Sequence, residues 1–213
     1  KIDATGKLSK LFMAIPSQLS RKSTRFYTNS IVGEVKKATE AEMLIKLEDS
    51  KAVLVSYHSD DPNVGMSLSQ DISKYKLFVS DIGLFVTMVF WDKDFAENII
   101  YQKLLADKLE ANLGYIYENL MAQMLTAAGN RLFYYTFEKD EKHSYEVDFL
   151  LSRGNKICPI EVKSSGYKSH ASLDAFRAKY SSRIKNSYLF YTKDFMAGDN
   201  EMIYMPFYMA GLI

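Results

Sequence analysis

The sequence predicts an α/β protein made of two modules, residues 1–110 and residues 111–213. In the first module, helix-like segments are followed by two β-rich runs. In the second, the pattern changes to helix, three strands, helix and strand. Hydrophobic residues make up 47% of the 213 positions, which is ample material for a core.

The first module begins with two helix-like segments. Leu8, Leu11 and Phe12 share one face of the first helix, which we expect to end at Pro16. The second helix covers residues 34–50 and has an apolar side.

Two β-rich runs follow, at residues 52–58 and 74–81, with a polar loop between them. Helix, helix and a two-stranded ribbon in this order resemble a winged-helix layout. Such a module binds DNA in some proteins and contacts other proteins in others, and both uses stay open here. Residues 92–112 are helix-like and acidic.

The second module opens with the strongest helix signal in the chain, residues 113–129. Gly129 stands where a helix commonly ends. The apolar stripe of this helix consists of Leu113, Tyr117, Leu120, Met121 and Met124.

The rest of the second module alternates between strands and one helix. Ser172 is the expected N-cap of that helix. The strand-like runs are residues 131–137, 144–151, 156–164 and 186–192, the helix is 172–180, and a last apolar segment covers 201–213.

Two of these strands each carry an acid among apolar residues. A Gly-Asn pair at 154–155 separates them, which is a signal for a two-residue hairpin loop. That loop would place Asp148 opposite Glu161 and Glu146 opposite Lys163, with Cβ atoms about 4.5–5.5 Å apart. Because side chains alternate along a strand, the acids would share one face and leave the other to the core.

Two like charges that face each other destabilise a sheet, so a shared proton, a cation or a metal must offset them. Mg²⁺ prefers carboxylate oxygens. Lys163 could orient a water or stabilise charge on a phosphoryl group, which would make Asp148, Glu161 and Lys163 a phosphodiester-hydrolysis site. The alternative is a solvated, ion-paired face on which Lys163 neutralises Glu146. Both remain open.

Glu118 is a third candidate acid, beside the apolar stripe of the helix at 113–129. It could be a further metal ligand pointing toward the hairpin, or an ordinary surface glutamate. Its neighbours on the helical wheel are Ala111, Gly114, Ala122 and Leu125.

The motifs YENL, EVDFLL and IEVKS, on this order of helix and strands, resemble the PD-(D/E)XK nuclease superfamily, which has the restriction-endonuclease-like fold. More narrowly, the sequence resembles the uncharacterised C-terminal domain of many prokaryotic AAA-type ATPases. In that family a winged-helix-like part precedes a nuclease-like part. IPSQLS, LEDSKAVLVSYH and KLFVSDIGL match it in the same order.

By this resemblance, Glu118 matches the helical acid, Asp148 the strand acid, and Glu161 with Lys163 the E-x-K pair. Active members bind one or two divalent cations, Mg²⁺ or Mn²⁺, and cut DNA. The resemblance therefore implies Asp148, Glu161 and Lys163 as catalytic residues, and Glu118, Asp148 and Glu161 as metal ligands. Val147 stands where the superfamily's name has proline.

The resemblance also implies an AAA-type ATPase domain in cis as a partner. No G-x-x-x-x-G-K-[ST] loop occurs in the chain, so ATP would bind only to a part upstream of Lys1. We expect the chain to be a fragment. The alternative function is a non-catalytic regulatory module of the ATPase that binds nucleic acid or protein. A partner-binding protein of a toxin–antitoxin or defence system is a minor third hypothesis.

Charge and cysteine content limit the possible partners and the cellular compartment of the protein. The formal net charge is +1, but residues 1–40 hold eight Lys/Arg against three Asp/Glu. This basic end could attract phosphate or be an ordinary surface. The single Cys158 excludes an internal disulfide and fits a cytoplasmic protein. The longest apolar run, 82–91, is too short to span a membrane, and a homo-oligomer stays open.

Overall fold

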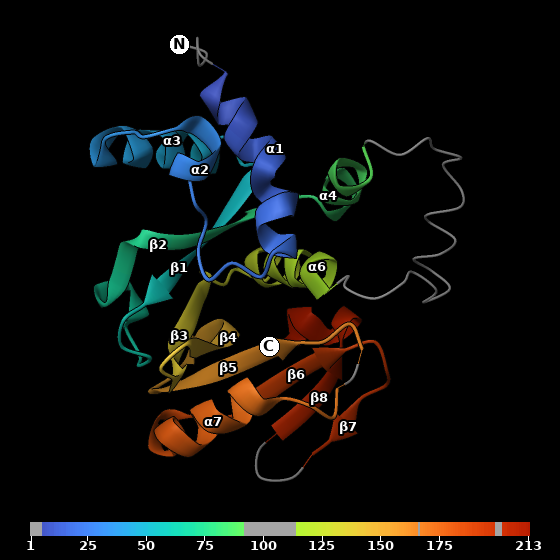
Figure 1. Ribbon diagram of the computed structural model, residues 1–213. Helices are drawn as coiled ribbons and strands as arrows, with labels where there is room; N and C mark the ends of the chain where they lie inside the picture. The colour runs from blue at the N-terminus through green and yellow to red at the C-terminus, as the bar shows by residue number, and fades with distance from the viewer. Residues whose placement is uncertain (1–5, 92–113, 166, 199–201) are drawn as a thin grey trace.

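The computed structural model describes residues 6–91, 114–165, 167–198 and 202–213 (Figure 1). The described chain is a mixed α/β structure around an eight-stranded sheet, with strand order β2-β1-β3-β4-β5-β6-β8-β7. Among the described helices, none has the length and apolar character that crossing a membrane would require.

The N-terminal helices lie together above the β1–β2 end of the sheet (Figure 1). The first of them does not end at Pro16, as predicted, but continues to Ser20. Ile15 and Leu19 are buried on either side of the proline, so packing of this face outweighs the lost backbone hydrogen bond. The three helices are α1 Lys7–Ser20, α2 Asn29–Val32 and α3 Lys37–Asp49.

The predicted β ribbon forms as β1 Val53–Ser59 and β2 Gln70–Val79, with the 3-10 helix η1 Met66–Leu68 between them. The ribbon is not a free wing, because β1 also pairs in parallel with β3 at Tyr57↔Phe133 and His58↔Tyr134. Strands of both predicted modules therefore share one sheet. The predicted boundary near residue 110, and the helix expected at 92–112, lie outside the described residues.

Two helices follow the ribbon, α4 Ile82–Val89 and α6 Gly114–Ala127. Helix α6 ends as predicted, at Gly129, whose φ of +83° lies in the left-handed region. The Gly129 N–H donates to the Thr126 carbonyl and the Asn130 N–H to the Leu125 carbonyl, which is a Schellman motif.

The observed buried face of α6 is rotated about the helix axis relative to the predicted apolar stripe. Of its predicted residues, Met121 is buried, Tyr117, Leu120 and Met124 are only partly buried, and Leu113 lies outside the described residues. A polar side chain shifts the face, because Asn119 is fully buried and bonded to β2. The buried residues are Ile116, Asn119, Met121, Ala122 and Leu125.

Asn119 fixes α6 against the edge of the sheet. Its Oδ1 accepts from the Val79 N–H at 2.8 Å, and its Nδ2 donates to the Val79 carbonyl at 2.9 Å. One turn further along, Gln123 Oε1 accepts from the Ile82 N–H at 2.8 Å. Since β2 is an edge strand, the amide of Asn119 satisfies backbone groups that have no neighbouring strand there.

The C-terminal part follows the predicted order of helix, three strands, helix and strand. The expected N-cap Ser172 is wrong, because α7 begins one residue earlier and His170 is its N-cap. The elements are β3 Phe133–Asp140, β4 His143–Arg153, β5 Lys156–Val162, α7 Ala171–Tyr180, η2 Ser181–Arg183, β6 Ser187–Tyr191, β7 Met196–Ala197, β8 Met202–Pro206 and η3 Phe207–Leu212.

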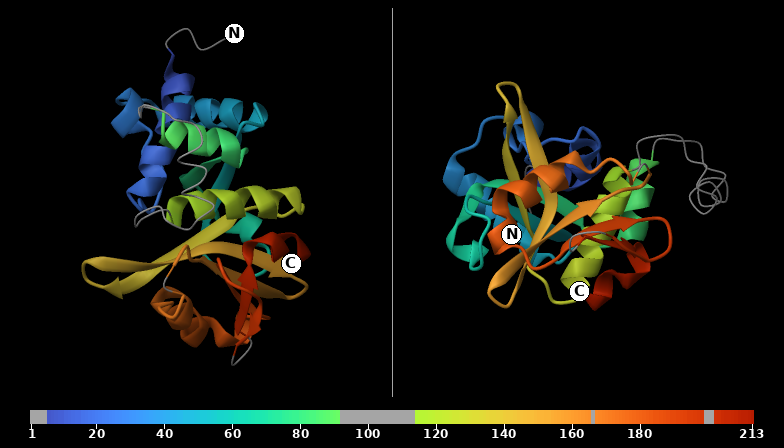
Figure 2. Two further views of the ribbon diagram at one scale, coloured as in Figure 1. Left: turned by 90° about the vertical axis from the view of Figure 1, so that its right-hand side faces the viewer. Right: turned by 90° about the horizontal axis from the view of Figure 1, so that it is seen from below.

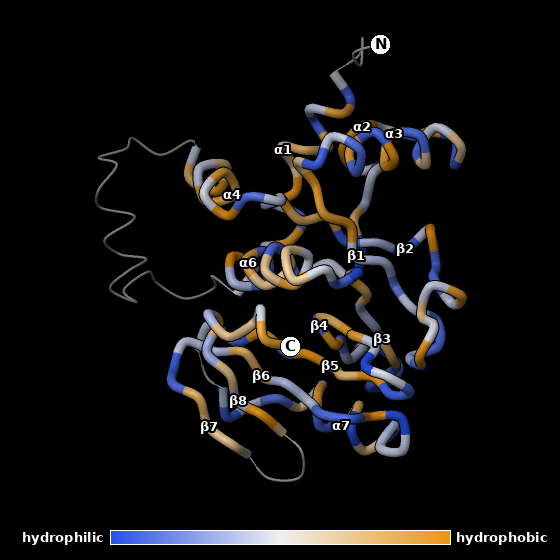
Figure 3. Tube along the Cα trace, turned by 180° about the vertical axis from the view of Figure 1, so that it is seen from behind, coloured by the Kyte–Doolittle hydropathy of each residue, from blue (hydrophilic) through white to orange (hydrophobic). Residues whose placement is uncertain are grey.

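Strands β3, β4 and β5 form an antiparallel meander, and β6 and β8 continue the sheet in parallel. Helices α6 and α7 lie on opposite sides of this region (Figure 2). Central strands such as β5 are hydrophobic along much of their length (Figure 3). The sheet is therefore covered on both faces, and polar groups on its central strands are withdrawn from water.

We expect Asn119→Ala to destabilise the fold by about 2–4 kcal/mol, because the Val79 N–H and carbonyl would both lose their partner. Urea unfolding measures this free energy. Asn29→Ala, at an exposed position, is the matched control and should change it by less than about 0.5 kcal/mol. Equal effects of the two changes would contradict the role given to Asn119.

Candidate metal centre

A cavity of about 460 Å³ lies where α6, β2, β4 and β5 meet. It contains four acids from three elements of the second module, α6, β4 and β5, and one lysine from β2. The charged residues that line it are Glu118, Glu146, Asp148, Glu161, Lys22, Lys76 and Lys163. Five serines, Ser20, Ser23, Ser164, Ser165 and Ser172, complete the polar part of its wall.

The β4–β5 hairpin has the predicted register from Arg153↔Lys156 to Phe149↔Ile160. The ladder then stops. In place of a further backbone pair, the Asp148 carboxylate accepts a hydrogen bond from the Val162 N–H at 2.7 Å. Asp148 and Glu161 both line the cavity, so they lie on the same side of the hairpin.

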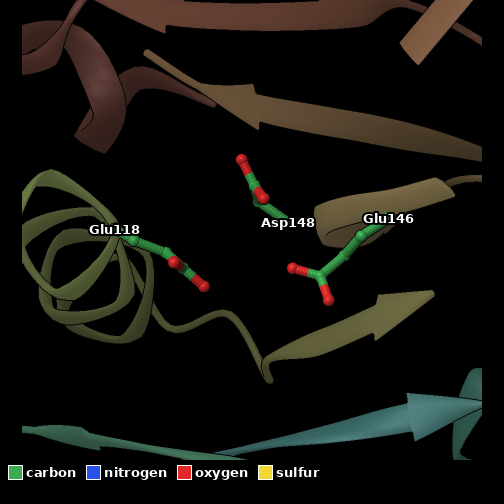
Figure 4. Close-up of side chains that lie close together, drawn as sticks. All are labelled: Glu118, Glu146 and Asp148. Carbon is green, nitrogen blue, oxygen red and sulfur yellow. The ribbon is translucent and has the colours of Figure 1, made fainter. Parts of the chain in front are cut away.

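Three carboxylates converge inside the cavity. Glu118 from α6 and Glu146 and Asp148 from β4 each offer an oxygen, and these oxygens lie within 4.8 Å of one another. Figure 4 shows the three side chains pointing into a common space. Glu118 is therefore turned inward, with a side chain that is mostly buried, and is not an ordinary surface glutamate.

Lys76 of β2 also reaches this space. Its ammonium donates to Glu146 Oε1 at 2.5 Å and to Glu118 Oε1 at 3.1 Å, and its side chain is only 4% exposed. The predicted pairing of Glu146 with Lys163 is therefore wrong, because Lys76 is nearer to Glu146. Sequence reasoning missed Lys76, although a lysine between the core residues Tyr75 and Leu77 was a visible signal.

Lys163 instead pairs with Glu161. Its ammonium lies 2.8 Å from Glu161 Oε1, and its backbone N–H donates to the Phe190 carbonyl at 2.8 Å. The other oxygen, Glu161 Oε2, is buried and has no hydrogen-bond partner among the described residues. The Glu161 side chain is 9% exposed, so water reaches it poorly. A buried carboxylate oxygen without a partner is unfavourable unless a cation is nearby.

Burial dominates the electrostatics of the cavity. It raises the pKa of Asp148 well above the usual range, and the charges of Glu161, Glu118 and Glu146 raise that pKa further. Burial also raises the pKa of Glu161, an effect that Lys163 only partly offsets. Burial would lower the pKa of Lys76, but Glu118, Glu146 and Asp148 outweigh it and raise that pKa.

The residues present fit a divalent cation. Carboxylate oxygens are the ligands that Mg²⁺ and Mn²⁺ take, and Glu161 Oε2 is an oxygen that needs a partner. If all four acids are ionised, the two lysines that pair with them, Lys76 and Lys163, offset two of their four charges. Asp148 and Glu161 are the acids not held by Lys76, so the fit is best there.

All four sequence-predicted site residues, Glu118, Asp148, Glu161 and Lys163, thus line one cavity. Their roles as metal ligands and catalytic groups remain predictions. Glu146, predicted only as a strand neighbour, belongs to the same cluster.

One family model matches part of the chain. Residues 113–209 match a family model described as a domain of unknown function (DUF4143). The matched segment contains the four acids and Lys163, while Lys76 precedes it. No curated protein and no solved structure matches the chain.

The raised pKa of Asp148 predicts a pH-dependent stability. The folded protein keeps this proton at pH values at which the unfolded chain has lost it. The contribution of Asp148 is therefore favourable below the ordinary carboxyl pKa and is lost as the pH rises through the raised value.

Asp148→Asn removes this titration, and an amide oxygen can still accept from the Val162 N–H. In chelator, we expect the variant to be more stable than the wild type at pH 8, and this difference in the free energy of unfolding to decrease toward pH 4. Urea unfolding at several pH values measures it, with the exposed Glu138→Gln as control. A gap that does not change with pH would refute the assignment.

Proposed function

We propose that this cavity is a nuclease site of PD-(D/E)XK type, which hydrolyses phosphodiester bonds of DNA with Mg²⁺ or Mn²⁺. The observation that carries the proposal is the meeting of Asp148, Glu161 and Lys163 in one cavity, where Glu161 Oε2 is buried without a partner. A structural ion pair would need only Glu161 and Lys163, and would leave that oxygen and Asp148 unexplained.

Each residue has a role that its position supports. Asp148 and Glu161 hold the cation, and Glu118 assists from α6. A bound divalent cation supplies Lewis acidity and lowers the pKa of a bound water. Lys163 pairs with the Glu161 carboxylate and lines the cavity, where it positions a water or stabilises charge on the phosphoryl group. The Val162 N–H keeps Asp148 oriented through its hydrogen bond.

The cavity wall also suits a phosphate. Ser20 is the last residue of α1, Lys22 and Ser23 follow it, and Ser164 and Ser165 follow β5. Their hydroxyl and ammonium groups are donors of the kind that bind phosphate oxygens. This donor-rich wall beside an acid cluster supports a phosphodiester as the substrate class.

The wider context belongs to the same proposal. The order α6-β3-β4-β5-α7-β6 is the order on which the resemblance to the nuclease superfamily rests. The helices α1 to α3 with the β1–β2 ribbon are the counterpart of the winged-helix-like part. The proposal also includes an AAA-type ATPase domain as a partner in cis. Fold-level likeness alone does not establish activity, so the site must be tested directly.

One observation favours a second candidate function. Lys76 already forms ion pairs with Glu118 and Glu146, so two of the four acids have a cation as partner without any metal. In this alternative the domain is a non-catalytic regulatory module of the ATPase, and the cavity binds nucleic acid or protein without cutting it.

Cleavage of plasmid and end-labelled oligonucleotides in Mg²⁺ or Mn²⁺ tests the proposal. We expect metal-dependent cleavage by the wild type and a loss of about 100-fold or more in Asp148→Asn and Lys163→Met, since each removes a group that acts on the reacting centre. Glu138→Gln and Lys168→Met change exposed charges and should retain activity.

Cleavage that survives both site substitutions would refute the assignment of the site. Binding of the same oligonucleotides by wild type and variants, with no cleavage in either metal, would favour the second candidate. A gel-shift assay run beside the cleavage assay separates these results.

A further inference from the structure

Lys76 is an unusual cation for this cavity because it comes from outside the acid-bearing module. It lies on β2, and its side chain is 4% exposed. Besides the two ion pairs with Glu118 and Glu146, its ammonium lies 5.3 Å from the centre of the Tyr134 ring. A lysine so far removed from water is stable only when its charge is fully compensated.

The two acids that hold Lys76, Glu118 and Glu146, belong to the converging cluster. Glu118, Glu146 and Asp148 bring three carboxylate oxygens within 4.8 Å of one another, a spacing that suits a hard cation. An ammonium and a divalent cation repel each other and compete for the same oxygen lone pairs. While Lys76 is bonded to both Glu118 and Glu146, a second ion cannot bind between these two carboxylates, although Glu118 can still assist the ion at Asp148 and Glu161.

The remaining charge lies elsewhere in the cavity. Glu161 shares one oxygen with Lys163 and keeps the other without a partner in the described structure. Asp148 makes no ion pair with Lys76 within 4.0 Å among the described contacts. Asp148 therefore carries a charge that no described ion pair offsets, and together with the unpartnered Glu161 Oε2 it offers two oxygens to one divalent cation.

The backbone holds Lys76 firmly in this position. It pairs with Ser56 across the β1–β2 ribbon. On the other side, Asn119 bonds β2 to α6 directly beside Glu118. Backbone pairing and the Asn119 side chain therefore hold β2, which carries Lys76, against α6, which carries Glu118.

We propose that Lys76 takes the place of a second cation at Glu118 and Glu146, and so limits the site to one divalent cation. The inference rests on the proposed metal site at Asp148 and Glu161. It assigns the β1–β2 ribbon a part in that site, because the ribbon sets how many ions the acid cluster binds.

Counting Mn²⁺ ions bound per chain tests this, by isothermal titration and by the electron paramagnetic resonance signal of free Mn²⁺. We expect one ion in the wild type and two in Lys76→Met and Lys76→Gln, which both remove the charge. The glutamine amide can still donate to one carboxylate, so this variant keeps the fold if the methionine variant does not. Lys76→Arg retains the charge and should bind one ion. Lys74→Met, on the same strand and more exposed, is the control.

A second readout is the melting temperature. In chelator the two neutral variants should melt below the wild type, and added Mn²⁺ should raise their melting temperature more than that of the wild type.

Each possible number of bound Mn²⁺ ions supports or refutes a part of the proposal. One ion in the wild type and one in both neutral variants, or two in the wild type, overturns the role of Lys76. No ion in the wild type but one in the neutral variants supports that role and refutes the metal site at Asp148 and Glu161. No ion in any variant refutes both.

Discussion

The structure depends on compensating four carboxylates that lie together with little access to water. Two lysines do this from different parts of the chain, Lys76 from β2 and Lys163 from the end of β5. The rest of the cavity follows from that need. The ribbon must lie against α6 for Lys76 to reach its acids. Hydrogen bonds between the Asn119 side chain and the Val79 main chain keep the ribbon there. The result is a polar cluster inside a largely apolar fold.

Local signals in the sequence were sufficient to predict much of this architecture. The Gly-Asn pair set the hairpin register, because a two-residue loop leaves little freedom in pairing. Gly129 ended α6 because glycine adopts a positive φ without strain. Alternation along β4 and β5 placed Asp148 and Glu161 on a common side, which brought them into one cavity.

The features that sequence reasoning missed or predicted wrongly have a different cause. Each depends on contacts made in the folded core, which the local sequence pattern does not show. Lys76 meets Glu118 and Glu146 across 42 and 70 residues, and no local pattern records such a pairing. Asn119 is buried only because β2 offers it a free edge, and this turns the inner face of α6 away from the apolar stripe. Likewise Pro16 lies within a helix because its neighbours Ile15 and Leu19 pack into the core.

The parallel contact between β1 and β3 has a further consequence, which concerns the order of assembly. The β4–β5 hairpin closes over two residues, so it can form early, whereas Tyr57 and His58 must find Phe133 and Tyr134 across a long intervening stretch. If the hairpin forms first, its acids would gather before the ribbon brings Lys76 to them. Their mutual repulsion would then oppose collapse, and dissolved cations would act on the folding rate of this chain as well as on its final state.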